Sequence, residues 1–348
     1  MKLRKIIALI LCFILALSLF SCKDDGREIK PRAKTIYRHF NTVSAVYSYL
    51  GDSEEEFGSN YAIVEATLVK WHKLLDIYFP YSGLNNLYTL NRMAGKGPVE
   101  LAPELIDFLL YCKEIHTLTG GRVNIAFGAV TALWHDEREL ALDEDNPSPA
   151  KLPSLAALEE AALHTDINCL VIDKENSTAE ITDAKMRLDV GAVGKGYAAE
   201  LAAKELRAKG VSSYVLNIGG NLICLGEKPN GDGWSTGITN PDKSSNSFAT
   251  TTTLKDTACV TSGDYERYYV VDGKNYHHII DPATLMPAEY FSSVTVLCSD
   301  SALADALSTA LFCLSYEDGL ALVESIGGID VLWIKADGTQ YKTDGFDR

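Results

Sequence analysis

The chain has 348 residues, of which 47% are hydrophobic and 23% charged, and its formal net charge at pH 7 is −15. This composition is typical of a folded globular protein and excludes a disordered or collagen-like chain. The acidic balance argues against binding to a nucleic-acid backbone, which requires clustered lysine and arginine. We therefore expect no nucleic-acid partner.

The N-terminus has the pattern of a bacterial export signal. Three basic residues precede an apolar run from Ile6 to Phe20, which at 15 residues is shorter than a membrane-spanning helix of about 20. The run ends at Leu19-Phe20-Ser21-Cys22, which resembles a lipobox, where the cysteine receives lipid. We expect residues 1–21 to be a lipoprotein signal peptide, 22–37 a lipid-anchored tether and 38–348 the folded domain. This places the protein on the extracytoplasmic face of the cell membrane; a plain signal peptide is the alternative.

The remainder of the chain predicts strands and helices in one compact domain. Apolar residues at helical spacing favour helices, and β-branched and aromatic residues favour strands. We expect strands at residues 35–50, 214–225, 234–239, 249–260, 267–271, 293–298 and 331–334, and helices at 54–78, 103–119, 155–164, 193–209, 301–314 and 316–326. No fixed repeat and no long linker divides the chain.

The cysteines of the predicted domain show no metal-binding spacing. They are Cys112, Cys169, Cys224, Cys259, Cys298 and Cys313. No CxxC pair occurs among them, and most lie in apolar runs, which favours buried free thiols. Disulfides remain an alternative, because an exported protein meets an oxidising compartment.

A glycine-rich segment, Leu188–Glu200, precedes a predicted helix and contains Lys195. Glycines let a backbone approach a ligand closely, and the N-terminus of a helix offers free N–H groups to an anion. The segment is neither a P-loop nor a dinucleotide-binding fingerprint, and a tight strand-to-helix turn would explain it equally well. A second glycine pair lies downstream in Asn217–Asn221.

Two further segments carry groups suited to proton transfer. They are Thr261–Tyr268 and Tyr276–Pro282. The adjacent His277 and His278 would face opposite sides of a strand, so one can serve a site. A histidine beside Asp281 is a candidate for moving a proton, although a structural role is the alternative.

A third segment suits a hard cation. Asp305 and Thr309 lie four residues apart, and on a helix they share one face. A carboxylate, a hydroxyl and nearby carbonyl groups are ligands that Mg²⁺ or Ca²⁺ prefers. The pair by itself does not establish a metal site.

In this order, these segments resemble the ApbE family, the FAD:protein FMN transferases. The matching segments are Tyr81–Asn91, Gly120–Val130, Leu188–Ala198, Asn217–Gly220, Thr261–Tyr269, His277–Thr284 and Ala304–Leu311. The resemblance extends over about residues 38–335. It implies an α+β fold, a single ApbE-like domain with a mixed, largely antiparallel sheet and packed helices.

The resemblance implies a transferase that cleaves FAD with a divalent cation, usually Mg²⁺. FMN would be joined by a phosphoester to a Thr or Ser hydroxyl of a partner protein, with release of AMP. The partner would be an exported FMN-binding-domain protein, such as an Rnf- or Nqr-type subunit. Two alternatives are a metal-dependent FAD pyrophosphatase that releases free FMN and AMP, and a non-enzymatic FAD-binding lipoprotein.

The resemblance also assigns roles to individual residues. The metal ligands would be the Ala192 carbonyl, the Asp305 carboxylate and the Thr309 hydroxyl. The catalytic residues would be Asp305 and His278, the latter as the base. The FAD contacts would be Phe40, Thr42, Asn124, Gly194, Lys195, His278 and Ile279.

The chain departs from the family pattern at three positions. Asn41 and Leu285 stand where the family usually has glycine, and Asn124 stands where many relatives have aspartate. We expect the turn after Pro282 to differ from the family's, because leucine replaces its glycine. We expect activity to persist, because none of these changes affects Lys195 or the assigned metal ligands.

Overall fold

The computed structural model describes residues 23–24, 27–28, 31–145, 148–245 and 247–347. The predicted signal peptide and Cys22 lie outside the described residues. Within the described part of the chain, no helix combines the length and the apolar character needed to cross a membrane.

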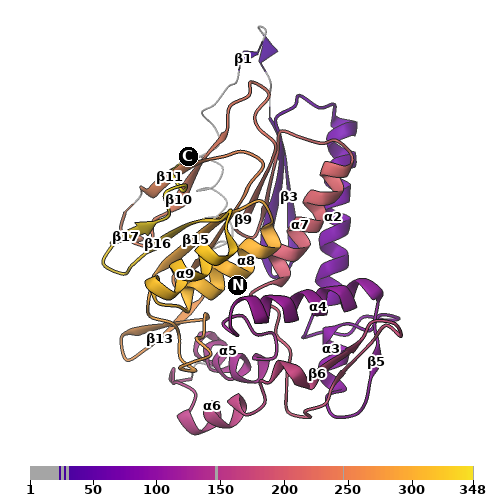
Figure 1. Cartoon of the computed structure of the whole chain (residues 1–348), viewed down its shortest axis with the longest axis vertical. Helices are drawn as coiled ribbons and strands as arrows, with labels where there is room; N and C mark the ends of the chain where they lie inside the picture. The colour runs from indigo at the N-terminus through magenta and orange to yellow at the C-terminus, as the bar shows by residue number, and fades with distance from the viewer. Residues whose placement is uncertain (1–22, 25–26, 29–30, 146–147, 246, 348) are drawn as a thin grey trace.

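An eight-stranded sheet forms the centre of the fold (Figure 1). Its strands, in spatial order, are β17 (Gln340–Lys342), β16 (Asp330–Ile334), β15 (Ser293–Cys298), β12 (Ala258–Gly263), β9 (Asn221–Leu225), β8 (Tyr214–Ile218), β4 (Thr42–Ser48) and β3 (Arg32–His39). Every neighbouring pair in this sheet is antiparallel, as predicted. The strands β15 and β16 are buried along their whole length, which indicates that both faces of the sheet are covered there.

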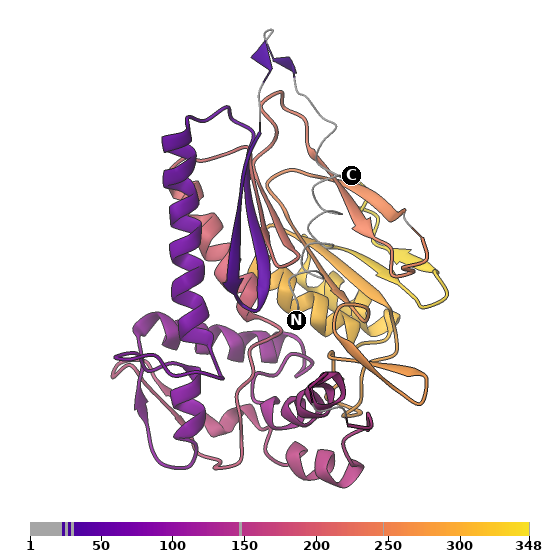
Figure 2. The ribbon, with the colours of Figure 1, turned by 180° about the vertical axis from the view of Figure 1, so that it is seen from behind.

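Helices cover one face of the sheet, and a hairpin covers part of the other (Figures 1 and 2). The helices are α2 (Glu54–Leu75), α7 (Gly194–Ala208), α8 (Ser301–Phe312) and α9 (Tyr316–Ile326). The hairpin consists of β10 (Trp234–Thr239) and β11 (Phe248–Leu254). Its Trp234 and Leu254 pack against sheet residues such as Cys224 and Leu332.

The remaining elements gather at one end of the sheet (Figure 1). They are α3 (Leu87–Arg92), α4 (Pro103–Leu118), α5 (Gly128–Leu142), α6 (Leu155–Ala162), a short 3₁₀ helix (Ile167–Cys169), a three-stranded sheet of β5 (Val99–Glu100), β7 (Thr178–Ile181) and β6 (Leu170–Asp173), and the hairpin of β13 (Tyr268–Val271) and β14 (Lys274–His277). The hairpin packs on α5 and α6 through an apolar cluster that includes Trp134 and Tyr269.

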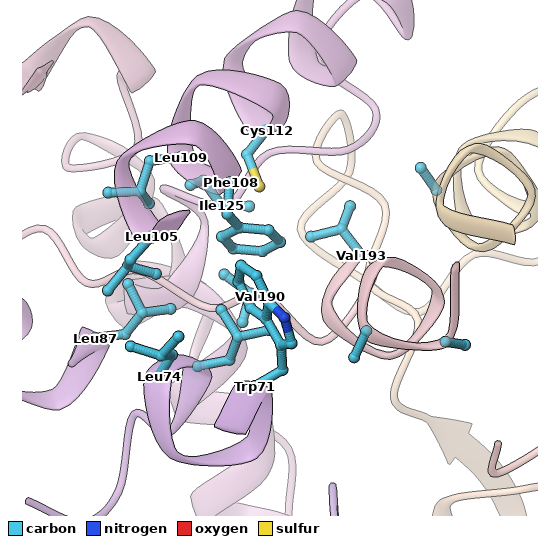
Figure 3. Packing of buried hydrophobic residues seen from close by; sticks show 14 of the residues in the cluster. Trp71, Leu74, Leu87, Leu105, Phe108, Leu109, Cys112, Ile125, Val190 and Val193 are labelled. Carbon is cyan, nitrogen blue, oxygen red and sulfur yellow. The ribbon is translucent and has the colours of Figure 1, made fainter. Parts of the chain in front are cut away.

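The largest apolar core fixes the glycine-rich turn that precedes α7. Trp71 of α2 and Phe108 of α4 lie at its centre with ring centroids 5.9 Å apart (Figure 3). Val190 and Val193, on either side of the turn, insert their side chains into this core (Figure 3). The buried valines, together with the bonds from the Val193 and Gly194 amides to the Val190 carbonyl, therefore fix the backbone of the turn.

The hairpins account for most differences from the predicted elements. The single strand expected at 35–50 is the hairpin β3–β4, and Phe40 and Asn41 make its turn with φ values of 53° and 50°. The segment 214–225 is likewise a hairpin, and 249–260 divides into β11 and β12. Helices α3 and α5 were not predicted. The other helices lie where the apolar periodicity placed them, within a few residues.

The edge strand β3 begins at Arg32, inside the segment predicted as tether, and pairs with β4 along its length. Before it, β1 (Lys23–Asp24) and β2 (Arg27–Glu28) pair with each other.

The six cysteines are free thiols, as predicted. Five are buried and Cys169 is partly exposed. Burial raises the pKa of the Cys259 thiol to about 12, so this thiol stays protonated and unreactive at neutral pH.

Candidate active site

The site is built where α7 crosses α8. The would-be Cβ of Gly196 would lie 2.5 Å from the carbonyl oxygen of Ser301 and closer still to Asp305 Cβ, so only glycine allows this approach. The approach brings the Gly196 amide to Asp305, and it donates to Asp305 Oδ2 over 2.7 Å. A second bond between the helices runs from the Ser301 amide to Glu200 Oε2, over 2.9 Å.

Lys195 neutralises the buried Asp305 carboxylate. Asp305 is 4% exposed, and its Oδ1 lies 3.4 Å from Lys195 Nζ. The same ammonium group lies 3.4 Å from Oδ1 of Asn221, which is 2% exposed. Asn221 Nδ2 is buried without a hydrogen-bond partner among the described residues. The ammonium is thus held between two acceptors at long distances, a loose arrangement that a further ligand can alter.

The turn before α7 leaves one carbonyl open. In a regular helix the Gly196 amide would donate to the carbonyl of Ala192, but here it donates to Asp305. Within the described chain no backbone amide reaches the Ala192 oxygen. The predicted ligand set of Ala192, Asp305 and Thr309 therefore contains a free carbonyl, a buried carboxylate and a hydroxyl.

Thr309 lies beside Asp305 on α8, and Ser262 of β12 adds a second hydroxyl. Thr309 Oγ1 lies 3.4 Å from Ser262 Oγ and 3.4 Å from the Asp305 carbonyl. No group of three or more His, Cys, Asp or Glu side chains suited to a metal occurs in the described residues. A cation here would instead be held by one carboxylate together with hydroxyl and carbonyl oxygens, a donor set that fits Mg²⁺. We call Ala192, Lys195, Asn221, Ser262, Asp305 and Thr309 the Asp305 cluster.

The β3–β4 turn reaches the same cluster. Thr42 packs on Gly219, where a Cβ would lie 2.6 Å from Thr42 Oγ1. Gly219 belongs to the turn that leads to Asn221. Phe40 lies against His72 of α2, with ring centroids 5.8 Å apart. Of the predicted FAD contacts, Thr42 therefore lies against the turn that leads to Asn221, whereas Phe40 contacts α2. Gly194, also predicted, is the first residue of α7.

The two adjacent histidines point to opposite sides, as predicted. His277 is buried; its Nδ1 accepts from the Ile279 amide, so its Nε2 carries the proton that is donated to the Ala288 carbonyl over 2.8 Å. His278 is solvent-accessible, and its Nδ1 donates to the Arg267 carbonyl over 3.2 Å. Because Nδ1 carries the proton in this bond, Nε2 of the neutral His278 ring keeps a free lone pair.

The surroundings of His278 favour the neutral ring. Its pKa is lowered, first because neighbouring protein atoms displace water from around the charged form and second because the Arg267 guanidinium repels it. His277 and Arg138 act in the same direction. At neutral pH His278 is therefore available as a proton acceptor, the role expected of a base.

The segment 261–268 connects His278 with the Asp305 cluster. Ser262, near its start, contacts Thr309, and the Arg267 carbonyl, near its end, holds His278. The structure shows no hydrogen bond or ion pair between His278 and Lys195 or Asp305 among the described residues. His278 and the Asp305 cluster are thus separate groups, joined by one segment of chain.

Asp281 does not assist a histidine. It is buried and pairs with Arg122, whose Nη1 lies 2.8 Å from Asp281 Oδ1. The same oxygen accepts from the Ala283 amide, so Asp281 holds the following turn. In that turn Leu285 has a φ of 62°, the left-handed conformation. Leucine adopts this glycine-like conformation at a cost of about 1 kcal/mol; whether the turn differs from the family's stays a prediction.

Asn124 makes its hydrogen bonds within the fold. Its Nδ2 donates to the Thr165 carbonyl over 2.8 Å, and its Oδ1 accepts from the Ala126 amide over 2.9 Å. Aspartate would lack the donor for Thr165. The carbonyl of the adjacent Ile125 accepts from the Asp189 amide, which places Asn124 near the glycine-rich turn. The side-chain amide of Asn124 is already engaged in the two bonds to Thr165 and Ala126.

A cavity lies beside the start of the glycine-rich segment. It has a volume of about 910 Å³, and Arg187, Leu188 and Asp189 form part of its wall. Asp189 connects it to the turn, because its two oxygens accept from the Gly191 amide and the Thr131 hydroxyl. None of the residues assigned from the family resemblance lines this cavity.

Several residues of the site were not predicted as functional. Asn221, Ser262 and Arg267 lie within segments that the sequence singled out, but only the folded chain shows that they contact Lys195, Thr309 and His278. Tyr78 is the last residue of the helix predicted over 54–78 and Phe79 follows it, and in the structure both lie beyond the end of α2. They are 57% and 65% exposed.

Known proteins match this chain in sequence and in fold. The profile of the ApbE family matches residues 42–333. An FAD:protein FMN transferase of Treponema pallidum is 35% identical over 266 residues, which cover 72% of this chain and 71% of the relative. A protein of the same name from Klebsiella pneumoniae is 30% identical over 246 residues, 70% of this chain and 73% of the relative.

Among solved structures, the ApbE protein of Thermotoga maritima superposes with a TM-score of 0.79 at 25% identity, covering 92% of this chain and all of that one. The flavinyl transferase ApbE of Pseudomonas stutzeri superposes with a TM-score of 0.73 at 24% identity, covering 92% of this chain and 98% of the other. The second likeness concerns the fold alone.

Proposed function

Because this chain belongs to the ApbE family, we propose that it is an FAD:protein FMN transferase that depends on Mg²⁺. Its substrates would be FAD and an exported FMN-binding-domain protein, such as an Rnf- or Nqr-type subunit. The products would be AMP and the partner carrying FMN on a Thr or Ser hydroxyl. The observation that carries this proposal is the Asp305 cluster, a buried carboxylate with an open carbonyl and a lysine at the N-terminus of a helix.

The Asp305 cluster would hold the divalent cation through the Asp305 carboxylate, the Thr309 hydroxyl and the Ala192 carbonyl. When bound, the cation supplies positive charge to the phosphoryl oxygens of FAD. Lys195 lies at the same place, and its ammonium is only loosely held. We propose that Lys195 turns toward the phosphates and offsets the negative charge that develops on them.

His278 would take the proton of the acceptor. A hydroxyl is a weak nucleophile at neutral pH and needs a base. The acceptor oxygen forms a bond to the phosphorus on the FMN side of the pyrophosphate, and the bond from that phosphorus to the bridging oxygen breaks. The hydroxyl proton passes to His278 Nε2, and the bridging oxygen leaves with AMP. The Arg267 carbonyl keeps the ring oriented through Nδ1–H.

The test uses the chain from Lys23 onward with FAD and Mg²⁺, with and without a purified FMN-binding-domain protein. We would follow AMP release and the mass of the partner. A gain of one FMN on the partner, with AMP formed mainly when the partner is present, would support the transferase. Equal amounts of AMP and free FMN without a partner would instead show a pyrophosphatase. FAD that binds but is never cleaved would indicate a carrier.

We further propose that the protein is exported and lipid-anchored through Cys22, with residues 1–21 removed. The support is the lipobox-like sequence alone. Metabolic labelling with palmitate would test this proposal. Label and membrane association should both be lost in the Cys22→Ala variant; a wild-type protein that takes up no label would refute the anchor.

A further inference from the structure

Three hydroxyl groups form a closed arrangement beside Asp305. Ser308 and Thr309 follow Asp305 by three and four residues in α8, so the three side chains share one face of the helix. Ser262 of β12 faces them, with its Oγ 2.8 Å from Ser308 Oγ and 3.4 Å from Thr309 Oγ1. The Asp305 carbonyl oxygen lies 2.9 Å from Ser308 Oγ and 3.4 Å from Thr309 Oγ1. The three hydroxyls and this carbonyl therefore form a ring of contacts.

The strand fixes Ser262 on the face that meets α8. Ser262 is paired with Val294 of β15, and Val294 packs in an apolar cluster with residues of α8. Side chains alternate along a strand, so the preceding Thr261 points to the opposite face. There its Oγ1 lies 2.8 Å from Thr295 Oγ1. Ser308 has no exposed surface, so its hydroxyl finds its partners inside the protein.

The protons of the ring can run in two directions, because each hydroxyl has one proton to donate. In the first direction Thr309 donates to Ser262, Ser262 donates to Ser308, and Ser308 donates to the Asp305 carbonyl. These contacts measure 3.4, 2.8 and 2.9 Å. In the second direction Ser308 donates to Ser262, Ser262 donates to Thr309, and Thr309 donates to the carbonyl, over 2.8, 3.4 and 3.4 Å. The shorter contacts favour the first direction.

The two directions leave different groups on the Thr309 oxygen. In the second direction one lone pair of Thr309 Oγ1 accepts the proton of Ser262. In the first direction Thr309 only donates, and both lone pairs of its oxygen stay free. A cation is bound through lone pairs, and a proton directed at the same oxygen competes with it. Only the first direction therefore suits Thr309 as a ligand of the cation.

We propose that Ser262 and Ser308 are positioning residues for the divalent cation. Ser262 accepts the proton of Thr309 and donates its own to Ser308, and this keeps the oxygen of Thr309 open toward the cation. The inference rests on the cation site of the proposed function. Residues that orient a metal ligand in this way typically change metal affinity by about 10–100-fold.

The test measures Mn²⁺ binding directly, by electron paramagnetic resonance, in the chain from Lys23 onward without FAD. The variants are Ser262→Ala, Ser308→Ala and the double variant. Thr261→Val is the matched control, because it removes a hydroxyl from the same strand but from the opposite face. Equilibrium unfolding in urea of each variant reports its stability separately from its metal affinity.

Ser262→Ala should raise the Kd for Mn²⁺ about tenfold, because the proton of Thr309 then has only the carbonyl at 3.4 Å. Thr261→Val should change this Kd less than twofold. Ser308→Ala should raise the Kd further than Ser262→Ala, because the proton of Ser262 loses its acceptor and turns to Thr309 Oγ1. The double variant lacks that competing proton, so it should bind Mn²⁺ more tightly than Ser308→Ala alone.

Two results would overturn the inference while leaving the cation site intact. One is an unchanged Kd for Mn²⁺ in Ser262→Ala, even if its stability in urea falls as much as that of Thr261→Val. The other is a double variant that binds Mn²⁺ more weakly than either single variant, as independent structural losses would produce.

Failure of the proposed function gives a different result. A wild-type chain that transfers FMN but binds no Mn²⁺ would overturn the cation site and this inference together. A wild-type chain that binds Mn²⁺ but neither cleaves FAD nor transfers FMN would overturn the proposed function alone.

Discussion

Replacement of Gly196 by alanine is the most direct test of how the site is assembled. In a helix interior, alanine is ordinarily more stable than glycine by up to about 1 kcal/mol. Here the new Cβ would lie 2.5 Å from the Ser301 carbonyl oxygen and 3.1 Å from Asp305 Cγ. Both distances are far below ordinary contact, so α7 and α8 must move apart.

The movement has two costs. Overpacking of a close contact costs about 1–3 kcal/mol. It also weakens the bond from the Gly196 amide to Asp305 Oδ2, and a hydrogen bond to a charged group contributes about 1.5–3 kcal/mol. After the helix preference of alanine is subtracted, Gly196→Ala should lower the free energy of unfolding by about 2–4 kcal/mol.

Gly58 supplies a matched control. It lies in α2, and a Cβ there would meet no atom within 4 Å. Gly58→Ala should therefore raise the free energy of unfolding by about 0.5–1 kcal/mol. Equilibrium unfolding in urea of both variants, with matching m-values, measures the difference. If Gly196→Ala proved as stable as the wild type, the close crossing of α7 and α8 would not be needed for the fold.

Three further variants test single interactions. Asp305→Asn keeps an acceptor for the neighbouring amide but removes the charge, so Mn²⁺ affinity measured by electron paramagnetic resonance should fall at least tenfold while the circular dichroism spectrum is unchanged. Because the pKa of His278 is lowered, the rate of single-turnover transfer should fall with acid only below pH 6.5. Arg267→Ala removes a repulsive charge and raises that pKa, so the fall should begin at a higher pH. A pH profile that does not move would exclude His278 as the base. Arg122→Met leaves the buried Asp281 carboxylate with one amide partner. It should lower the free energy of urea unfolding by about 2–3 kcal/mol, less than the about 3–5 kcal/mol of a fully buried pair, because Arg122 is partly exposed.

The sequence predicted those elements whose capping residues and apolar spacing match the structure that the chain adopts. Helix α2 begins at a capping box on Ser53 and has regular apolar spacing, and its start was predicted at the observed residue. Helix α5 was missed because it begins at Gly128 after Phe127, which provides no side-chain cap. The hairpin turn at Phe40 and Asn41 was missed because neither residue is glycine or proline, although both adopt a positive φ.

The site could be predicted only in part. Short motifs singled out Lys195 and Asp305, yet 110 positions separate these residues. Their contact depends on the crossing of two helices, which no spacing in the sequence encodes. The family resemblance supplied the association. The role of Asn221 in holding Lys195 follows from the three-dimensional arrangement alone.

An acidic chain can bind an anionic ligand when positive charge is placed locally, as Lys195 is placed beside Asp305. At the Asp305 cluster the charges are enclosed, since Asp305 is 4% exposed. Arg92 and Arg187, by contrast, are exposed. Salt screens exposed charges over about 8 Å at physiological ionic strength and affects enclosed ones much less. If the enclosed charges of the Asp305 cluster hold FAD, raising NaCl from 50 to 300 mM should change the Kd for FAD less than twofold. A Kd for FAD that rises several-fold would mean that exposed arginines hold FAD instead.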